Sequence, residues 1–286
     1  MFSTYRKVLV IAGLVFCLLS YAFAYSGGSG EPNNPYQISN VSDWNDLMHT
    51  SSDWNKYFIM TADVNLYGVT LTPVGNDSTQ FTGVFDGNDN IISNAVINQP
   101  GSWYVGLFGY VGSGGQIRNL GVENVNITGR DFVGGLVGWN EGTLTSCYVT
   151  GLVTGTGTVN PCIGGLVGVN YSGSLTACYA TGSVSGTHNV GGLVGGSDYG
   201  TLIDCFWDIQ TSGQETSDGG TGKTTAEMKQ VSTFANWDFV ETWGIEDNQT
   251  YPFLKLTYPV GNLNYDKVVD FFDFAILASH WLEDER

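Results

Sequence analysis

Few residues in this sequence are of a type and spacing that could carry out a reaction. The segment GGTGKTT at residues 219–225 has the composition of a phosphate-binding loop, but Ser217 stands where that loop requires its first glycine. The three histidines, His49, His188 and His280, are far apart, and none lies in the H-E-x-x-H pattern of a zinc peptidase. We therefore predict neither nucleotide binding nor peptidase activity.

Acidic residues are the other candidates for catalysis, because glycosidases use two carboxylates about 5–10 Å apart. Asp86 and Asp89 lie in one predicted turn, and Asp63 precedes them. Aspartates in turns commonly serve the turn itself. The other aspartates that we considered are scattered along the chain: Asp131, Asp198 and Asp204. We predict no catalytic residues.

A recurring glycine pattern must position whatever this chain presents. It reads GGLVG around Leu136, Leu166 and Leu193, and it has a shorter form around Leu107. These leucines are 29, 30 and 27 residues apart in chain order. A near-constant period of this length is typical of a solenoid.

Each copy contains three short segments with strand character. The first is the glycine pattern itself, the second reads TLTSCYV at residues 143–149, and the third reads GLVTG at residues 151–155. Three short strands cannot bury an apolar face alone, so successive copies must stack about 4.8 Å apart and share one core. We predict an all-β fold, a right-handed parallel β-helix of about five or six turns. Glycine pairs such as Gly134-Gly135 would supply positive φ and close backbone approach at a corner.

The composition and the first residues predict a protein outside the cell. Arg6 and Lys7 precede an apolar run at residues 8–19, and Ala-Phe-Ala follows at residues 22–24. This pattern predicts a signal peptide over residues 1–24, with no transmembrane segment after its removal. The net charge of −17 disfavours nucleic acid as a partner. We predict a bacterial protein that is secreted or held at the cell surface.

The rest of the chain divides into a solenoid and a tail. We place the β-helix at residues 25–256, with its repeat core at about 105–207. Tryptophan-rich residues 208–256 should close its C-terminal end, and residues 257–286 should form a separate small helical tail.

A short helix should cover the N-terminal end of the β-helix, where an open sheet would otherwise be exposed. Ser42 could cap this helix, and Trp44, Leu47 and Met48 would share one of its faces.

Cysteines occupy the same place in three successive copies, at Cys147, Cys178 and Cys205. If the residue before each cysteine forms a bend, the three side chains face inward and form a structural ladder of small apolar groups. Disulfides between adjacent turns are the alternative, but parallel side-chain directions disfavour the required dihedral angle. We favour free thiols.

Aromatic residues follow these cysteines, and they would then face outward. Tyr148, Tyr179 and Phe206 are our predicted ligand-binding residues, since aromatic faces can stack on sugar rings and repeat proteins bind through extended faces. The expected partner is an extracellular polysaccharide or another cell-surface component. The alternative is that the rings only stack on each other and stiffen the wall.

The repeat resembles the GLUG motif, which is named for its glycine-leucine-any-glycine core. The resemblance rests on the order GGLVG, then G-x-L-x-x-C-Y, then G-x-V, and the flanking segments are similar to large exported GLUG-repeat proteins of planctomycete-type bacteria. It covers about residues 35–256. It implies a β-helical, adhesin-like surface role without an established activity.

The tail segment NLNYDKVVDFFDFAILASHWLED resembles half of a type I dockerin, a calcium-binding module related to the EF-hand. Position 1 of its loop is Asn instead of Asp, Lys267 stands where the sharp turn favours Gly, and only one loop is present. These departures argue against a cohesin-like partner, and the alternative is that the acidic residues cap a final helix. The calcium ligands that the loop chemistry implies are Asn262, Asn264, Asp266, the Val268 carbonyl, Asp270 and Asp273.

Together these features predict a secreted, non-catalytic β-solenoid that acts in adhesion or glycan contact. The alternative is a β-helical carbohydrate-active enzyme, a polysaccharide lyase or hydrolase, or its accessory domain. We expect no cofactor apart from calcium at the tail loop.

Overall fold

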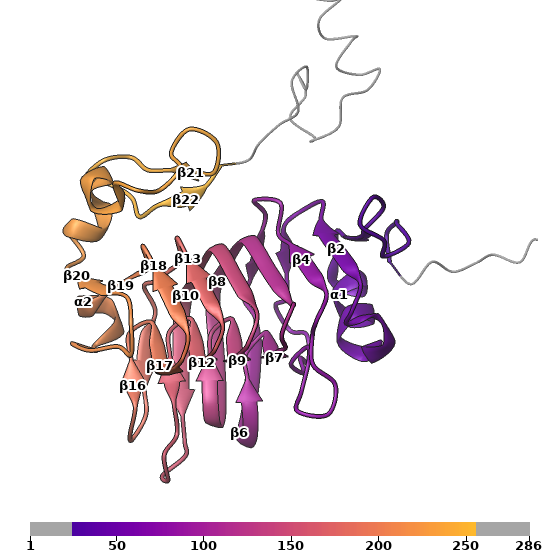
Figure 1. Ribbon diagram of the computed structural model, residues 1–286, viewed down its shortest axis with the longest axis horizontal. Helices are drawn as coiled ribbons and strands as arrows, with labels where there is room; N and C mark the ends of the chain where they lie inside the picture. Colours follow the sequence, from indigo (N-terminus) through magenta and orange to yellow (C-terminus); the bar gives the residue numbers. More distant parts are fainter. Residues whose placement is uncertain (1–24, 256–286) are drawn as a thin grey trace, which may run out of the picture.

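The protein forms a parallel β-solenoid of about six turns, as a computed structural model of residues 25–255 shows (Figure 1). This architecture confirms the predicted fold class. The predicted signal peptide and the predicted calcium loop, with its ligands from Asn262 to Asp273, lie outside the described residues.

One side of the solenoid is a four-stranded parallel sheet built from the glycine-rich repeat. Its strands are β7 (Phe108–Val111), β9 (Val137–Asn140), β12 (Val167–Tyr171) and β17 (Val194–Asp198).

The other two sides belong to one larger parallel sheet, because its longest strands bend around a corner. These long strands are β8 (Gln116–Gly134) and β10 (Thr143–Gly155). Shorter strands continue the stack: β11 (Ile163–Gly164), β13 (Ser174–Thr176), β14 (Tyr179–Ala180), β15 (Ser183–Ser185), β16 (Val190–Gly191), β18 (Thr201–Ile203) and β19 (Phe206–Asp208).

The irregular sequence before the repeats forms the first turns of the solenoid. Its strands join the larger sheet in parallel, with β2 next to β4 and β4 next to β8. They are β1 (Tyr36–Ile38), β2 (Tyr57–Met60), β3 (Val64–Asn65), β4 (Val84–Asp86), β5 (Ile91–Ser93) and β6 (Val96–Val105).

The repeat leucines stack directly on one another inside the solenoid. Leu136 donates its backbone N–H to the Leu166 carbonyl at 3.0 Å, and Leu166 donates to the Leu193 carbonyl at 2.9 Å. All three side chains are fully buried. The repeat period therefore sets the stacking of the turns, which confirms the predicted arrangement.

The paired glycines permit close approach, but they do not supply the positive φ that we predicted. A Cβ on Gly134 would lie 2.1 Å from the Val137 carbonyl oxygen, and one on Gly164 would lie 2.0 Å from the Val167 oxygen. Neither glycine has a positive φ; the left-handed residue of the corner precedes the pattern, as at Phe132 with φ 55°. Crowding by the backbone is thus what excludes other residues from these positions.

A second corner orients the cysteines and the aromatic residues that follow them. Ser146, Ala177 and Asp204 each have φ between 50° and 53°, so each turn makes the same left-handed bend at this place. The bend directs the following cysteines into the core, as predicted, and Cys147, Cys178 and Cys205 are buried there.

The N-terminal end of the stack is covered by the helix α1 (Val41–His49), as predicted (Figure 1). The helix residues Trp44, Leu47 and Met48 are buried against the core. The N-cap is Asn40 and not Ser42, because the Asn40 side chain accepts hydrogen bonds from the backbone N–H groups of residues 42 and 43. A short 3₁₀ helix, η1 (Ser51–Asp53), follows.

Residues beyond the repeats end the stack and then turn back along it. The helix α2 (Ile209–Ser212) leads to β20 (Thr221–Lys223), which adds a last parallel strand beside β19. Residues 224–255, called the closing segment below, fold over the outer side near β10, β13 and β18 instead of over the end (Figure 1). This corrects the predicted end cap. The closing segment contains η2 (Glu227–Lys229), η3 (Val231–Phe234), β21 (Trp243–Gly244) and β22 (Phe253–Leu254).

Candidate binding surfaces

The three predicted ligand-binding rings form the expected outward column. Tyr148, Tyr179 and Phe206 are register partners on β10, β14 and β19. The first two rings stack with centroids 5.1 Å apart and planes 6° apart. However, their exposed fractions are only 3%, 2% and 8%.

The closing segment covers this column. The Trp243 ring lies 6.2 Å from the Tyr148 ring and 6.0 Å from the Tyr179 ring, and the Trp237 ring lies 4.4 Å from Trp243. The Tyr179 hydroxyl donates to the Pro252 carbonyl. Burial raises the pKa of the Tyr179 phenol well above its ordinary value.

In the structure described, this column offers no open aromatic face on which a sugar ring could stack, so the burial of the rings does not support the predicted glycan contact. The column packs against the closing segment instead. This arrangement is closer to our alternative, in which the rings have a structural role and stiffen the wall of the solenoid. The physical reason is that the outward-facing rings bury their apolar surface against another segment of the same chain.

A second group of contacting aromatic rings lies on the solenoid, and part of it is exposed. Its exposed members include Trp103 at 51%, Tyr171 at 37% and Tyr199 at 85%. Consecutive ring centroids in the group are 5.2 to 6.1 Å apart. We call this group the aromatic surface; it comprises Trp103, Tyr104, Tyr110, Phe132, Trp139, Tyr171 and Tyr199.

Stacking of the turns brings these rings together from distant parts of the sequence. Tyr110 and Trp139 are register partners on β7 and β9. Tyr104 and Phe132 occupy the same left-handed corner in successive turns, with φ 56° and 55°, and their centroids are 5.3 Å apart. The backbone of each turn thus determines where its ring lies.

One carboxylate fixes the centre of the aromatic surface. Glu141 Oε1 accepts hydrogen bonds from the Tyr110 hydroxyl at 2.6 Å and from Trp139 Nε1 at 3.2 Å. Burial and this hydrogen bond raise the pKa of Tyr110. The two rings are therefore positioned before any ligand arrives, which lowers the entropy cost of binding.

The aromatic surface was not predicted from the sequence, although a signal was present. Trp139 and Tyr171 stand in the turns WNEG and VNYSG, and Phe132 directly precedes a glycine pattern. They were missed because they do not recur at one fixed position, so only the stacked turns bring them side by side.

The predicted cysteine ladder is present in the core. The Cys178 thiol lies between those of Cys147 and Cys205, and its pKa is raised well above the ordinary value by burial. Cys147, Cys162, Cys178 and Cys205 are all free in the structure. Low thiolate content and burial make the ladder unreactive.

Two of the aspartates that we considered for catalysis, Asp63 and Asp86, are engaged in hydrogen bonds to the backbone or in an ion pair. Asp86 accepts from Arg118 Nε at 2.8 Å and from the backbone N–H of Asn88. Asp63 accepts from the backbone N–H of Ile91, one turn further along. Within residues 25–255, no three His, Cys, Asp or Glu side chains form a group suited to a metal ion. No helix in that same range is long and apolar enough to cross a membrane.

The molecule is therefore a parallel β-solenoid with an exposed aromatic surface and a covered aromatic column. Its residues 159–185 match the model of the GLUG motif, so the chain carries the repeat that its sequence resembled. A planctomycete type and a dockerin-like tail stay predictions.

Two relatives match about half of this chain. This chain is 35% identical to halomucin of Haloquadratum walsbyi over 153 residues. The match covers 49% of this chain and 2% of halomucin. The chain is also 32% identical, over 163 residues, to a protein of Evansella cellulosilytica that is provisionally named a Gly-rich membrane protein. This match covers 54% of the chain and 16% of that protein. The chain thus spans only a small part of each relative.

One solved structure has a similar fold. It is a protein of Bacteroides ovatus that is provisionally named an immunoglobulin A1 protease. The match has a TM-score of 0.58 and 18% sequence identity, and it covers 82% of this chain and 96% of that one. At this identity the likeness concerns the fold alone.

Proposed function

We propose that this protein is a non-catalytic module of the bacterial cell surface or its surroundings, and that it contacts glycans through the aromatic surface. The observation that carries the proposal is the group of seven contacting rings, of which Trp103, Tyr171 and Tyr199 are exposed. Exposed aromatic clusters of this kind mark binding sites on soluble proteins. Aromatic faces suit sugars because the C–H faces of a sugar ring can stack on them, while its hydroxyls bond to polar neighbours.

The charge of the chain supports a ligand that is not an anion. The sequence has 27 acidic and 10 basic residues, and such a surface repels nucleic acid and anionic membranes. The names of the two relatives, a mucin-like name and a membrane-protein name, support a place at the cell surface. The aspartates bonded within turns give no support to the alternative of a carbohydrate-active enzyme.

Retention on insoluble polysaccharides tests the proposal. Trp139→Ala with Tyr171→Ala removes the centre of the aromatic surface, and it should abolish any retention that the unmodified protein shows. Phe253→Ala is a matched control, because that ring is 41% exposed on the closing segment, away from the aromatic surface. Equal retention of the double variant and the unmodified protein would refute the proposal.

A further inference from the structure

We propose that a groove beside Tyr67 binds an uncharged sugar unit, and that it continues toward the aromatic surface as a path for an extended neutral polysaccharide. This inference rests on the proposed function and deepens it, because it names the ligand class and adds a separate set of contacts. The groove has a volume of about 420 Å³. Its lining residues are Tyr67, Asn94, Val96, Asn124, Val125, Asn126, Gly151 and Leu152.

The groove exists because two successive turns differ by one residue at a corner. Val122 pairs with Val149, but Val125 pairs with Gly151, so two residues of β8 oppose one residue of β10. The wider turn therefore projects beyond the narrower one and leaves a step in the wall. A Cβ on Gly151 would lie 2.3 Å from the backbone of Val125, so no side chain fills that step.

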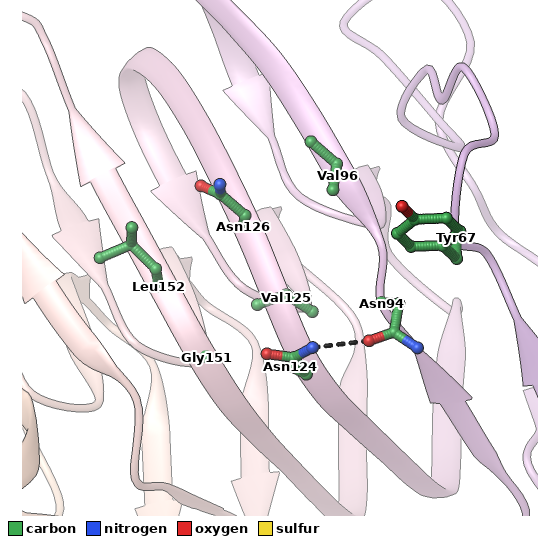
Figure 2. A pocket seen from close by; sticks show the side chains of 8 residues that line it. All are labelled: Tyr67, Asn94, Val96, Asn124, Val125, Asn126, Gly151 and Leu152. Carbon is green, nitrogen blue, oxygen red and sulfur yellow. Dashed lines mark hydrogen bonds between the residues drawn. The ribbon is translucent and has the colours of Figure 1, made fainter.

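A chain of side-chain amides leads to the step and ends there (Figure 2). Asn94 Nδ2 donates to Asn65 Oδ1 at 3.0 Å, and Asn124 Nδ2 donates to Asn94 Oδ1 at 2.6 Å. The next turn has Gly151 at this corner and cannot extend the series. In the described residues, Asn124 Oδ1 therefore keeps an unused acceptor at the groove, where a hydroxyl donor could bind.

Tyr67 forms the opposite rim of the groove (Figure 2). It is 82% exposed, although it stands in a tight turn where its backbone N–H donates to Asn65 Oδ1 at 3.0 Å. Across the groove, Val96 and Leu152 present exposed aliphatic side chains on β6 and β10. An aromatic rim, a row of amides and a small aliphatic floor match the alternating polar and apolar faces of a sugar ring.

The groove continues through two further hollows to the aromatic surface. The second hollow, of about 620 Å³, shares Tyr67 and Val96 with the groove. The third, of about 350 Å³, shares Thr72 and Gln99 with the second and includes Trp103 in its lining. Shared lining residues make this one continuous path, whose length suits a chain of sugars better than a single one.

None of the residues that line the path is charged, in a protein with net charge −17. Side-chain amides supply most of its polarity, and an amide both donates and accepts hydrogen bonds, as sugar hydroxyls do. The lining offers a carboxylate-bearing polysaccharide no cation, and Arg130, which lies over the Trp103 ring at the end of the path, is already paired with Asp131. The path therefore favours neutral polysaccharides. The amide side chains that line it are Asn76, Asn94, Asn98, Gln99, Asn124 and Asn126.

Affinity electrophoresis of the full chain tests this inference, with gels that contain hydroxyethylcellulose, xylan or galactomannan as neutral probes and polygalacturonate as an anionic probe. We expect binding to at least one neutral probe. Tyr67→Ala should weaken that binding about tenfold, and Asn124→Gly about threefold. Glycine at position 124 keeps the left-handed backbone, because the native φ there is 53°.

Two matched variants control for general effects. Tyr57→Ala removes a tyrosine that is 36% exposed and does not line the path. Asn119→Gly changes another left-handed corner, φ 51°, whose amide bonds to Asp86. Both should bind as the unmodified protein does, and thermal melting should show that all four variants fold.

The outcomes separate this inference from the proposed function. If Trp139→Ala loses binding while Tyr67→Ala and Asn124→Gly retain it fully, the groove is refuted and the aromatic surface stands. Stronger binding to polygalacturonate than to every neutral probe would refute the ligand class. No binding to any of the four probes would overturn both proposals.

Discussion

Two groups of aromatic rings lie on the outside of this solenoid, and they have opposite fates. The column Tyr148, Tyr179 and Phe206 is regular from turn to turn, and the closing segment buries it. The aromatic surface around Trp139 is irregular, and its rings Trp103, Tyr171 and Tyr199 stay open to solvent. A regular column makes a flat wall against which another layer of the protein can pack. Regularity along the outside of a solenoid thus indicates an internal contact at least as well as a ligand site.

The closing segment is tied to the solenoid by polar groups as well as by apolar packing. Asp208 is buried at the end of β19 and accepts hydrogen bonds from the Tyr251 hydroxyl at 2.6 Å and from Thr225 Oγ1 at 2.7 Å. Its other oxygen caps α2. One carboxylate therefore fixes both ends of the closing segment relative to the last turns.

The largest expected effect comes from removing the ring that covers the tyrosine column. Trp243→Ala should lower the free energy of unfolding by about 3–5 kcal/mol, since Trp243 is 1% exposed and packs against the rings of Tyr148, Tyr179 and Trp237. Urea denaturation, followed by tryptophan fluorescence, would measure this loss. Val240 is 79% exposed, so Val240→Ala should change the free energy of unfolding by no more than about 0.5 kcal/mol. Similar losses in the two variants would break the distinction between covered and open surfaces.

The second-largest effect should come from alkaline pH, which should loosen the closing segment. Burial, followed by the hydrogen bond to Asp208, raises the pKa of Tyr251 from 10.0 to about 12 in the folded protein. A raised folded pKa means that this stability is complete below pH 10 and is lost as the pH rises from 10 to 12. Limited proteolysis across this range would detect the released segment.

Tyr251→Phe is the matched variant for that titration. It should lose the hydrogen bond to Asp208 at neutral pH, and it should show a smaller increase in cleavage between pH 10 and 12. An unchanged pH profile would assign the alkaline effect to the other buried tyrosines.

A smaller effect should follow from removing one hydroxyl of the covered column. Tyr148→Phe keeps the stacked ring but deletes the hydrogen bond to Glu123 Oε1, which is 2.6 Å long. We expect a loss of about 1 kcal/mol in the free energy of unfolding, because Glu123 can still be hydrated. Thermal melting would measure it, and a loss as large as that of Trp243→Ala would mean that the hydroxyl matters as much as the packing.

The smallest effect on stability should come from the aromatic surface. Tyr199→Ala removes a ring that is 85% exposed, so the free energy of unfolding should change by no more than about 0.5 kcal/mol. A clear loss of stability in urea denaturation would mean that the open rings also serve the wall, and it would weaken the contrast with the covered column.

Much of the wall could be predicted because it depends on recurrence. Leu136, Leu166 and Leu193 recur at nearly one period, and the cysteines recur with them, so stacking and inward facing follow from spacing. The positive φ assigned to the glycine pairs was wrong because two explanations of a glycine, left-handed backbone and close approach, leave the same sequence signal.

The candidate sites were less predictable, since they depend on pairs of residues that no local pattern links. The aromatic surface joins Tyr104 to Phe132 and Tyr110 to Trp139 across turns. The groove depends on a one-residue difference between β8 and β10, which is visible only once the register is known.

The sequence by itself determined that the chain stacks into a parallel solenoid with a core of leucine, valine and cysteine, because the repeat period alone places equivalent residues one above another. Only the tertiary structure decided which outer face remains available for binding. That choice depends on contacts such as the hydrogen bond from Tyr179 to Pro252, 73 residues further along. Burial of an outward ring is a property of the layer that reaches it, and the ring's own sequence neighbours do not specify that layer.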